Sequence, residues 1–387
     1  MKLALVHDWL NQRGGAEDVL EVLVAQFPNS PVYTSIYAPE LMPPAYRSWD
    51  IRTLWLNHAP AIHKRHQPYL PLYPLAWGSL NLSDYDIIVS NKSGFCHGVH
   101  HGERTLHICY CLAPTRYVWS LDAYLEREGL GAGTRLALRP LAALLRRWDF
   151  NAAQRVDRFI AISTEIRQRI QQFYRREAPV IFPPVMTERF QPANRIDDYF
   201  LVVSRLVPYK RIDLAVQAAT RLGVRLLVGG KGRDLDRLRA MAGPTVEFLG
   251  YVPDDDLPEL MARCKAFIFP GLEDFGITPV QAQAAGRPVI AFAGGGALDT
   301  VIPGQTGELF PEMTVESLMA VMTDFDDKRY NTALLRAHAQ RFDAAVFKRA
   351  LADFIDAAWD DFRASQKRPG RRPANGRANT PPGDQVD

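Results

Sequence analysis

The sequence lacks a disulfide framework, a strong excess of either charge and any long hydrophobic run. Its four cysteines include no CxxC pair, which argues against a zinc ribbon or a secreted disulfide scaffold and predicts reduced thiols. Lys and Arg number 46 against 43 Asp and Glu, so the overall charge does not indicate a nucleic-acid-binding protein. The first apolar run is too short for a signal-peptide core, and Asp8 interrupts it. We therefore expect a cytoplasmic protein that meets a membrane, if at all, from its surface.

The glycine fingerprint GxGxxG of nicotinamide-dinucleotide enzymes is also missing, which argues against an α/β dehydrogenase. The first apolar run is followed instead by HDWLNQRGGAEDVL, where Gly14 and Gly15 precede a helical pattern. Backbone N–H groups at such a pair can approach an anion closely. The two glycines can equally form only a tight strand-to-helix turn, and the residues alone favour that simpler interpretation.

Short apolar, β-branched runs alternate with helical patterns along the rest of the chain. Several of them, such as LLVG, FIFP and VIAF, are apolar on both faces, as parallel strands between two helix layers are. This alternation predicts α/β domains with doubly wound sheets. The expected strands are 2–7, 32–37, 86–90, 106–111, 158–163, 180–182, 199–204, 225–229, 246–249, 266–269 and 289–292.

The length of 387 residues suggests two domains, and the proline-rich segment 182–198 is the expected boundary between them. Near the end, an apolar stripe at helical spacing predicts an amphipathic helix. The final stretch is basic and rich in proline and glycine, which is typical of disorder. The expected parts are a first domain over 1–184, a second over 185–342, the helix over 343–365 and the tail over 366–387.

Ligands of open α/β sheets bind beyond the carboxyl ends of the strands, and two loops there carry cations. Arg205 and Lys210 follow one expected strand, where they can clamp a diphosphate or can be ordinary solvated charges. Gly230 and Lys231 follow the next strand and can cradle a phosphate, although their spacing is not that of a P-loop.

The stretch GLEDFGITPVQAQAAGRPVIA follows a third strand and opens a helix. Thr278 as N-cap, Pro279 at N1 and Gln281 at N3 would form a capping box, which gives Gln281 a purely structural explanation. Glu273 has no such explanation, because it lies in the loop at the carboxyl end of the strand. A helix N-terminus at that edge also favours a bound anion.

These four loops, in this order, resemble the family 4 retaining glycosyltransferases of GT-B fold. The family is marked by a Gly-Gly loop after the first strand, an SR…K segment in the second domain and a Glu–seven residues–Glu motif, here E-DFGITPV-Q. The resemblance runs from residue 1 to about residue 362. Stretches such as LVHDWLNQRGGAEDVL and APTRYVWS are most similar to a bacterial subgroup that includes mannosyltransferases of O-antigen and exopolysaccharide assembly.

The resemblance implies a role for each loop. Arg205 and Lys210 match the pair that binds the donor diphosphate, and Glu273 matches the motif Glu that contacts the donor sugar. Gln281 matches the second motif Glu, which holds the ribose hydroxyls, but its carboxamide replaces a carboxylate. Two alternatives follow: an active enzyme, which the intact cations and Glu273 favour, or a catalytically weakened nucleotide-sugar-binding partner protein.

Further matches surround these residues. His97 occupies roughly the position of the family's active-site histidine near the donor sugar and the acceptor, although the sequence alone favours a solvated loop histidine. The other expected donor contacts are Gly14, Gly15, Gly230, Lys231, Tyr251, Val252, Phe275, Gly276 and Ile277.

The activity implied is that of a retaining glycosyltransferase that moves a hexose, with mannose from GDP-mannose favoured, to a lipid-linked or saccharide acceptor in surface polysaccharide assembly. No metal or other cofactor is expected, since Arg and Lys would neutralise the leaving diphosphate. The DxD pattern, which other glycosyltransferases use to bind a metal ion, recurs too often along the chain to indicate a metal site. Residues 58–77 and 135–158 mix basic with apolar groups, which fits either contact with the inner membrane or an ordinary solvated surface.

Overall fold

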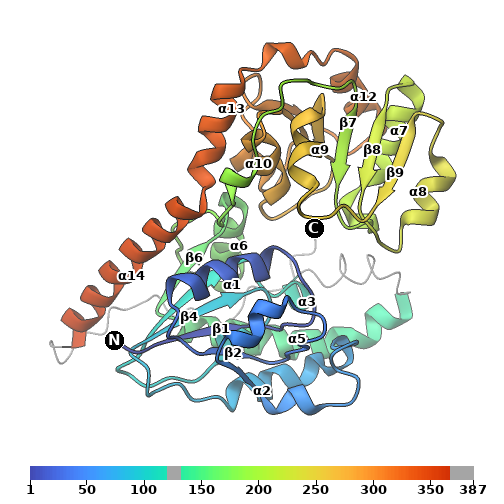
Figure 1. The fold of residues 1–387 in the computed structure, drawn as a ribbon. Coiled ribbons are helices and arrows are strands. Elements are labelled where there is room, and N and C mark those ends of the chain that lie inside the picture. The colour runs from blue at the N-terminus through green and yellow to red at the C-terminus, as the bar shows by residue number, and fades with distance from the viewer. Residues whose placement is uncertain (120–131, 367–387) are drawn as a thin grey trace. The chain divides into compact units, whose positions relative to one another are not determined.

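The computed structural model describes residues 1–119 and 132–366, with side chains from residue 138 onward in the second range, and it contains two α/β units. The first unit comprises Met1–Phe182 and the chain from Lys348 onward, and the second comprises Pro183–Phe347 (Figure 1). The division falls at the start of the expected boundary segment. Of the expected basic tail over 366–387, all but Gln366 lies outside the described residues.

The first unit is built on a six-stranded sheet in the order β3-β2-β1-β4-β5-β6, and every neighbouring pair is parallel. The chain winds outward from β1 to one edge and then returns to β4 beside β1, which is where the winding direction reverses. Ligands of such sheets bind at this switch point. The strands are β1 Leu3–His7, β2 Val32–Thr34, β3 Ile51–Thr53, β4 Ile87–Lys92, β5 Leu106–Cys111 and β6 Arg158–Ala161.

Helices of the first unit follow the strands, and α14 joins them from the far end of the chain. The carboxamide of Gln26 donates to the carbonyl of Lys348 at 2.9 Å, and that of Gln366 donates to the carbonyl of Glu103 at 2.7 Å. The helices are α1 Gly15–Gln26, η1 Pro44–Ser48, η2 Trp55–His58, η3 Gln67–Leu72, α2 Tyr73–Gly78, η4 Cys96–Gly98, α3 Arg116–Trp119, α5 Ala132–Arg155, α6 Thr164–Tyr174 and α14 Ala344–Gln366.

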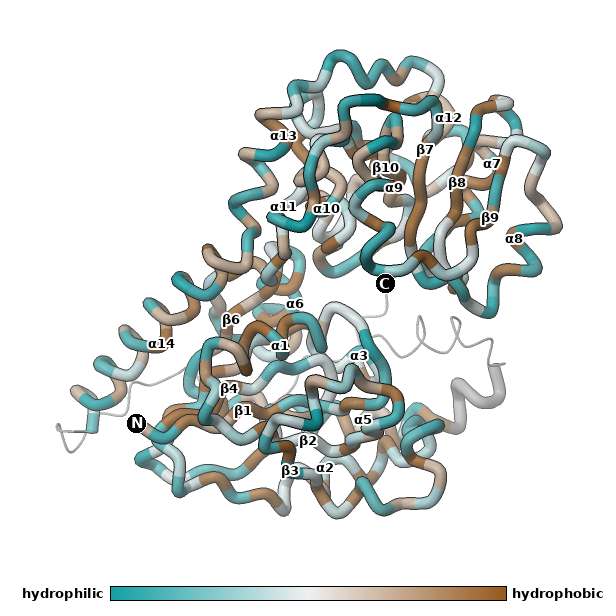
Figure 2. Tube along the Cα trace, in the orientation of Figure 1, coloured by the Kyte–Doolittle hydropathy of each residue, from teal (hydrophilic) through white to brown (hydrophobic). Residues whose placement is uncertain are grey.

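The second unit repeats this plan with a parallel sheet in the order β12-β11-β10-β7-β8-β9. Hydrophobic residues run along β7 and β8, and Phe200, Val202, Leu226 and Val228 of these strands are buried (Figure 2). The strands are β7 Phe200–Val203, β8 Leu226–Gly229, β9 Val246–Gly250, β10 Ala266–Phe269, β11 Val289–Phe292 and β12 Gly307–Phe310.

Short helices connect these strands. α7 is amphipathic: Ile212, Leu214, Ala215 and Val216 are buried, whereas Arg221 is exposed. The helices are η5 Thr187–Arg189, η6 Pro208–Lys210, α7 Ile212–Leu222, α8 Leu235–Met241, α9 Leu257–Arg263, α10 Ile277–Ala284, α11 Ala297–Thr300, α12 Val315–Thr323, η7 Asp327–Arg329, α13 Thr332–Ala339 and η8 Gln340–Phe342.

Two local predictions are wrong. Residues 180–182 form no strand; Val180 makes only an isolated bridge to Ala161 beside the edge strand β6. The capping box is also absent, because α10 begins at Ile277 and its N-cap is Gly276, with φ of 94°. The glycine turns the chain into the helix two residues before Thr278, which therefore lies inside the first turn.

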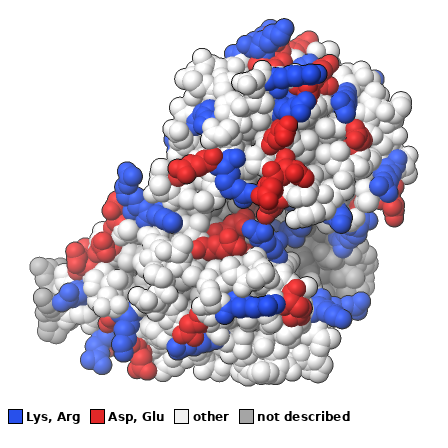
Figure 3. All heavy atoms as spheres, viewed as in Figure 1, with Lys and Arg blue, Asp and Glu red and all other residues white. Residues whose placement is uncertain are grey.

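The surface carries both charges. Lys and Arg are interspersed with Asp and Glu on the face shown in Figure 3, as the near-balanced composition predicts. Within residues 1–119 and 132–366, no helix combines the length and the apolar character needed to cross a membrane.

Candidate functional site

An ion pair lies at the carboxyl edge of the second sheet. The ammonium group of Lys210, in the loop after β7, pairs with Oε1 of Glu273, in the loop after β10. The exposed fractions of the two side chains are 18% and 16%, so solvent reaches both groups without surrounding them. A small pocket beside them is lined by Ser204, Gly271, Lys210 and Glu273. The structure thus brings together two residues that the sequence places in separate loops.

Arg205 extends this cluster into solvent. Its guanidinium group donates a hydrogen bond to the hydroxyl of Tyr209 at 3.3 Å, and Nζ of Lys210 lies 5.5 Å from the centroid of the same ring. The side chain of Arg205 is exposed, which leaves most of its donors free to meet a ligand. Arg205, Tyr209, Lys210 and Glu273 therefore form one continuous polar surface.

The loop that carries Glu273 is held through its backbone. The N–H of Gly296, after β11, donates to the carbonyl of Glu273 at 2.9 Å. A Cβ atom at Gly296 would overlap the backbone of Phe275, so the position has room only for hydrogen. Gly296 belongs to a run of three glycines over 294–296. The structure shows that it fixes the position of Glu273.

The start of α10 leaves backbone donors without a side-chain cap. Gly276 is the N-cap and, having no side chain, makes no side-chain cap hydrogen bond. Gln281 lies in the next turn, partly buried, and its carboxamide makes no hydrogen bond to another described residue. The side chain of Phe275 is buried, with its ring 5.7 Å from that of Phe342, so only its backbone can face a ligand.

The loop after β8, which is expected to cradle a phosphate, is held by backbone hydrogen bonds of its own. The N–H of Gly230 donates to the carbonyl of Gly250 at 2.6 Å, so this donor is already used. The N–H of Leu206 donates to the carbonyl of Lys231 at 3.0 Å, which ties this loop to the loop that carries Arg205. We conclude that the loop supports Arg205 through its backbone.

Lys231 and Tyr251 form an exposed pair at the same edge of the sheet. Nζ of Lys231 lies 5.7 Å from the centroid of the Tyr251 ring, and the tyrosine is 62% exposed. Val252 beside it is partly buried. An exposed aromatic face of this kind can stack on a nucleobase.

In the first unit, Gly14 and Gly15 lie exposed at the start of α1, where Gly14 is the N-cap in an extended conformation. Buried side chains beneath the glycine turn, those of His7, Glu17 and Asn91, support it. Nε2 of His7 lies 3.3 Å from Oε1 of Glu17, and the carboxamide of Asn91 donates to the carbonyl of Ala16 at 2.8 Å. The glycine turn is therefore both a strand-to-helix connection and an accessible helix N-terminus.

His97 is placed differently from either interpretation of the sequence. It is fully buried, with Nε2 3.3 Å from the carbonyl of Asp149 and its ring about 6 Å from those of Trp148 and Tyr174. Burial and the nearby ammonium of Lys92 hold the pKa of His97 well below its usual range. Because first-unit side chains enclose His97, the structure does not expose it to a sugar or an acceptor, contrary to the predicted substrate contact.

Asp8 is a structural residue that sequence reasoning missed. Its carboxylate accepts hydrogen bonds from four consecutive backbone N–H groups, those of Ser93, Gly94, Phe95 and Cys96, at 2.6 to 2.8 Å. The only local sign of this role in the sequence is that Asp8 directly follows the buried strand β1. Asp8 fixes the loop after β4 at the point where the winding of the sheet reverses.

Lys92 and Asp149 add a buried charged network beside that loop. The ammonium group of Lys92 donates to the carbonyl of Ala113 at 3.0 Å, and the carboxylate of Asp149 accepts from the Tyr174 hydroxyl at 2.7 Å. Burial lowers the pKa of Lys92, but the field of Asp149 and neighbouring groups outweighs burial and raises it overall. Asp149 also accepts from Trp119 at 2.7 Å, so the network anchors α3.

Metal-binding side chains do not gather in the part of the chain that the structure describes. No three or more His, Cys, Asp or Glu residues there could share a metal ion. All four cysteines are buried and unpaired with one another.

Residues 187–339 match the family of glycosyl transferases group 1. This part of the chain is a group 1 glycosyltransferase domain. The family resemblance read from the four loops is thus confirmed, and the matched range contains Arg205, Lys210, Glu273 and Gln281.

Curated relatives match parts of the chain. A GDP-mannose-dependent alpha-mannosyltransferase of Mycobacterium tuberculosis is 33% identical over 229 residues, which is 56% of this chain and 57% of the relative. An exopolysaccharide phosphotransferase of Streptomyces coelicolor is 28% identical over 225 residues, 54% of this chain but 23% of the relative. The chain therefore spans less than two-thirds of the length of either relative.

Solved structures confirm the predicted fold class. The Anabaena protein HepE in complex with UDP has a TM-score of 0.67 and 19% sequence identity, and the match covers 92% of this chain and 100% of HepE. Two parallel six-stranded sheets, each with its own helices, make this a GT-B fold.

Proposed function

We propose that this group 1 glycosyltransferase moves a hexose from a nucleoside-diphosphate sugar to a lipid-linked or saccharide acceptor, with retention of configuration and without a metal ion. The observation that carries the proposal is the cluster of Arg205, Lys210 and Glu273 at the carboxyl edge of the second sheet. It combines two cations for a diphosphate with a carboxylate for sugar hydroxyls, all inside the matched family domain.

Transfer of the sugar requires that negative charge on the leaving group be stabilised. As the bond between the anomeric carbon and the diphosphate oxygen breaks, charge builds on the departing diphosphate. Arg205, Lys210 and the uncapped N-terminus of α10 supply fixed positive charge and N–H donors for it. The acceptor hydroxyl forms the new bond on the same face of the sugar, and its proton passes to the departing phosphate.

Glu273 has two roles in this proposal. Before the donor binds, its carboxylate holds the ammonium group of Lys210 in place. When the diphosphate arrives, Lys210 turns toward it and the carboxylate becomes available to the sugar hydroxyls. The exchange of partners keeps both partly buried charges compensated at each stage.

GDP-mannose is the favoured donor in the proposal, with the exposed ring of Tyr251 stacking on the base. The support is that a relative at 33% identity is described as a GDP-mannose-dependent alpha-mannosyltransferase. The solved structure of HepE contains UDP instead, so a uridine donor is the alternative that the donor assay tests.

A membrane-bound acceptor would meet the first unit, and assembly of a surface polysaccharide at the cytoplasmic face of the inner membrane is the setting that we propose. Leu75 is 65% exposed in α2 and Leu144 is 69% exposed in α5. Lys64, Arg65 and Arg147 are exposed in the same two stretches, 58–77 and 135–158. Apolar side chains with nearby cations fit an anionic bilayer surface.

The second candidate is a catalytically weakened nucleotide-sugar-binding partner protein, which the carboxamide of Gln281 favours. One experiment separates the two. Purified protein is incubated with GDP-mannose, UDP-glucose and related donors, with and without lipid-linked sugar acceptors, and both thermal shift and donor cleavage are measured for wild type, Arg205→Ala and Glu273→Ala. The matched control is Arg221→Ala, which removes an exposed ion pair with Glu316.

The enzyme proposal expects one donor to stabilise the protein and to be cleaved, with both effects lost in Arg205→Ala and kept in Arg221→Ala. Binding of a donor without turnover on any lipid-linked acceptor would support the partner protein. If no nucleoside-diphosphate sugar changes the melting temperature, both candidates are wrong.

A further inference from the structure

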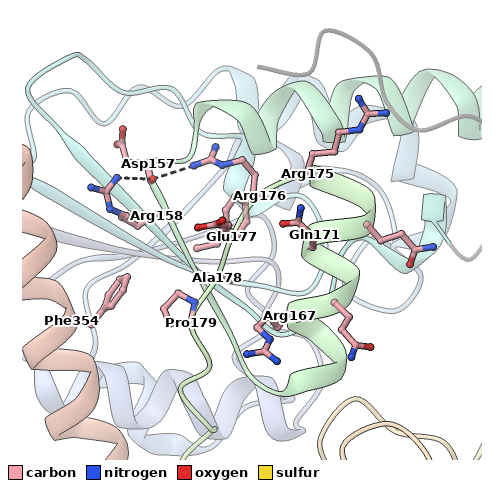
Figure 4. A pocket seen from close by; sticks show the side chains of 13 residues that line it. Asp157, Arg158, Arg167, Gln171, Arg175, Arg176, Glu177, Ala178, Pro179 and Phe354 are labelled. Carbon is pink, nitrogen blue, oxygen red and sulfur yellow. Dashed lines mark hydrogen bonds between the residues drawn. The ribbon is translucent and has the colours of Figure 1, made fainter. Parts of the chain in front are cut away.

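A second pocket lies in the first unit, around the start of the edge strand β6 and the end of α6 (Figure 4). It shares no residue with the cluster around Lys210 and Glu273. Because it surrounds the first residue of β6, it lies at the opposite end of that strand from the carboxyl edge. Its lining includes Arg158, Arg167, Arg175, Arg176, Gln171 and Phe354.

The charge of the Asp157 carboxylate acts on two of the four arginines, Arg158 and Arg176. Arg158 and Arg176 both donate to the backbone carbonyl of Asp157, at 3.2 and 3.1 Å, as the dashed lines in Figure 4 show. Arg167 and Arg175 are exposed and make no side-chain hydrogen bond or ion pair with any described residue. The guanidinium charges of Arg167 and Arg175 therefore remain available to a ligand.

The acids of the pocket do not cancel this charge. Asp157 accepts a hydrogen bond from the backbone N–H of His107 at 2.9 Å, and Glu177 is exposed. The lining thus contains four guanidinium groups and two carboxylates. The packing of Arg176 is also fixed, since a second donor of its guanidinium group binds the carbonyl of Ala153 at 3.0 Å.

We infer that this pocket binds a phosphate-bearing anion. Guanidinium groups recognise phosphate through paired N–H donors, and several of them in one hollow suit a ligand with more than one phosphate. Gln171 adds a neutral donor and Phe354 of α14 adds an apolar wall. Such a ligand could be a free organic phosphate or the headgroup of an anionic phospholipid.

Inorganic pyrophosphate is the probe for the shared chemistry, and the full chain is used throughout. To remove binding at the donor loops, titrations are made in an Arg205→Gln, Lys210→Gln background. We expect pyrophosphate still to bind this background in calorimetry. If it does not bind, the inference is wrong, whatever the outcome for the donor.

The pocket is then disabled by Arg167→Gln with Arg175→Asn, because asparagine tolerates the left-handed conformation of Arg175, with φ of 53°. We expect the affinity for pyrophosphate to fall at least about tenfold. The matched control is Arg169→Gln on the same helix, whose side chain pairs with Glu165 outside the lining. An equal fall in the control, or no fall in the double variant, would overturn the inference.

Vesicles distinguish the two sources of phosphate. Wild type and the double variant are sedimented with vesicles of phosphatidylcholine alone or with added phosphatidylglycerol. Loss of phosphatidylglycerol-dependent sedimentation in the double variant, beside weaker pyrophosphate binding, supports the pocket with a lipid headgroup as its ligand. Unchanged sedimentation with weaker pyrophosphate binding supports the pocket with a free phosphate ligand.

Discussion

Lys210 and Glu273 form an ion pair that joins the loops after β7 and β10. Each side chain is less than one-fifth exposed, so each charge depends on the other for compensation more than a surface pair would. The pairing explains how a cation and a carboxylate stay close together before any ligand arrives. The two residues can be tested separately, because the proposed function assigns Lys210 to the diphosphate and Glu273 to the sugar.

Glu273→Gln separates those two assignments. We expect kcat/KM to fall about 10- to 100-fold, because a carboxylate that accepts from the sugar hydroxyls is lost. The affinity for the nucleoside diphosphate alone should be unchanged or higher, since Lys210 no longer has a competing partner. Steady-state kinetics and calorimetry measure the two effects. A fall of more than about tenfold in nucleoside-diphosphate affinity would contradict the assignment.

Gly296→Ala tests whether the glycine run holds Glu273. A Cβ atom there would overlap the backbone of Phe275, so the loop must move. We expect a loss of about 1–3 kcal/mol in the free energy of unfolding, together with reduced turnover. Gly78→Ala is the control, because the nearest atom to its added Cβ, on His100, would be 3.7 Å away. Full activity in Gly296→Ala would show that the glycine does not position the site.

Gln281→Glu tests the ribose contact. Gln281 is not a capping-box residue in the structure, and its carboxamide is free of hydrogen bonds to described residues. A carboxylate accepts from both ribose hydroxyls more strongly, so we expect the KM for the donor to fall about tenfold while kcat changes little. Initial rates over a range of donor concentrations give both values. An unchanged KM would mean that residue 281 does not meet the ribose.

His66 makes the first unit sensitive to acid. Burial, opposed only in part by Asp8, lowers the pKa of His66 to about 4. Its ring packs 4.7 Å from that of Trp9. An unfolded histidine binds its proton near pH 6.5, so the free energy of unfolding should fall as the pH drops from about 6.5 toward 4, by up to about 1.4 kcal/mol per pH unit.

Urea unfolding between about pH 7 and pH 5 measures this slope. His66→Gln should flatten it relative to wild type, whereas His58→Gln, which changes an exposed residue, should leave it unchanged. Equal slopes for wild type and His66→Gln would show that His66 does not link stability to pH.

The sequence alone predicts strands correctly where neighbouring residues determine the structure. The predicted strands 106–111, 266–269 and 289–292 coincide with β5, β10 and β11, because runs that are apolar on both faces have few alternatives to a buried parallel strand. The short strand β12 was missed, since GELF carries a glutamate and a glycine. The capping box failed because Gly276 starts the helix before the pattern that suggested it.

The contacts of the candidate site could not be predicted from neighbouring residues, because they join distant parts of the chain. Nothing near Lys210 in the sequence indicates Glu273 as its partner, and only the order of the loops suggested that they converge. Asp8 binds backbone N–H groups more than 80 residues away, which no local pattern reports. His97 lies in a polar stretch that indicates an exposed loop, yet residues of α5 and α6 enclose it.

The central claim is that Arg205 and Lys210 bind the diphosphate of a nucleotide sugar. Calorimetric titration with GDP and UDP of wild type, Arg205→Ala and Lys210→Ala tests it most directly. We predict that wild type binds one of the two nucleotides, that each variant binds it at least about tenfold more weakly, and that Arg221→Ala binds it as wild type does. Undiminished binding by both Arg205→Ala and Lys210→Ala would contradict the claim.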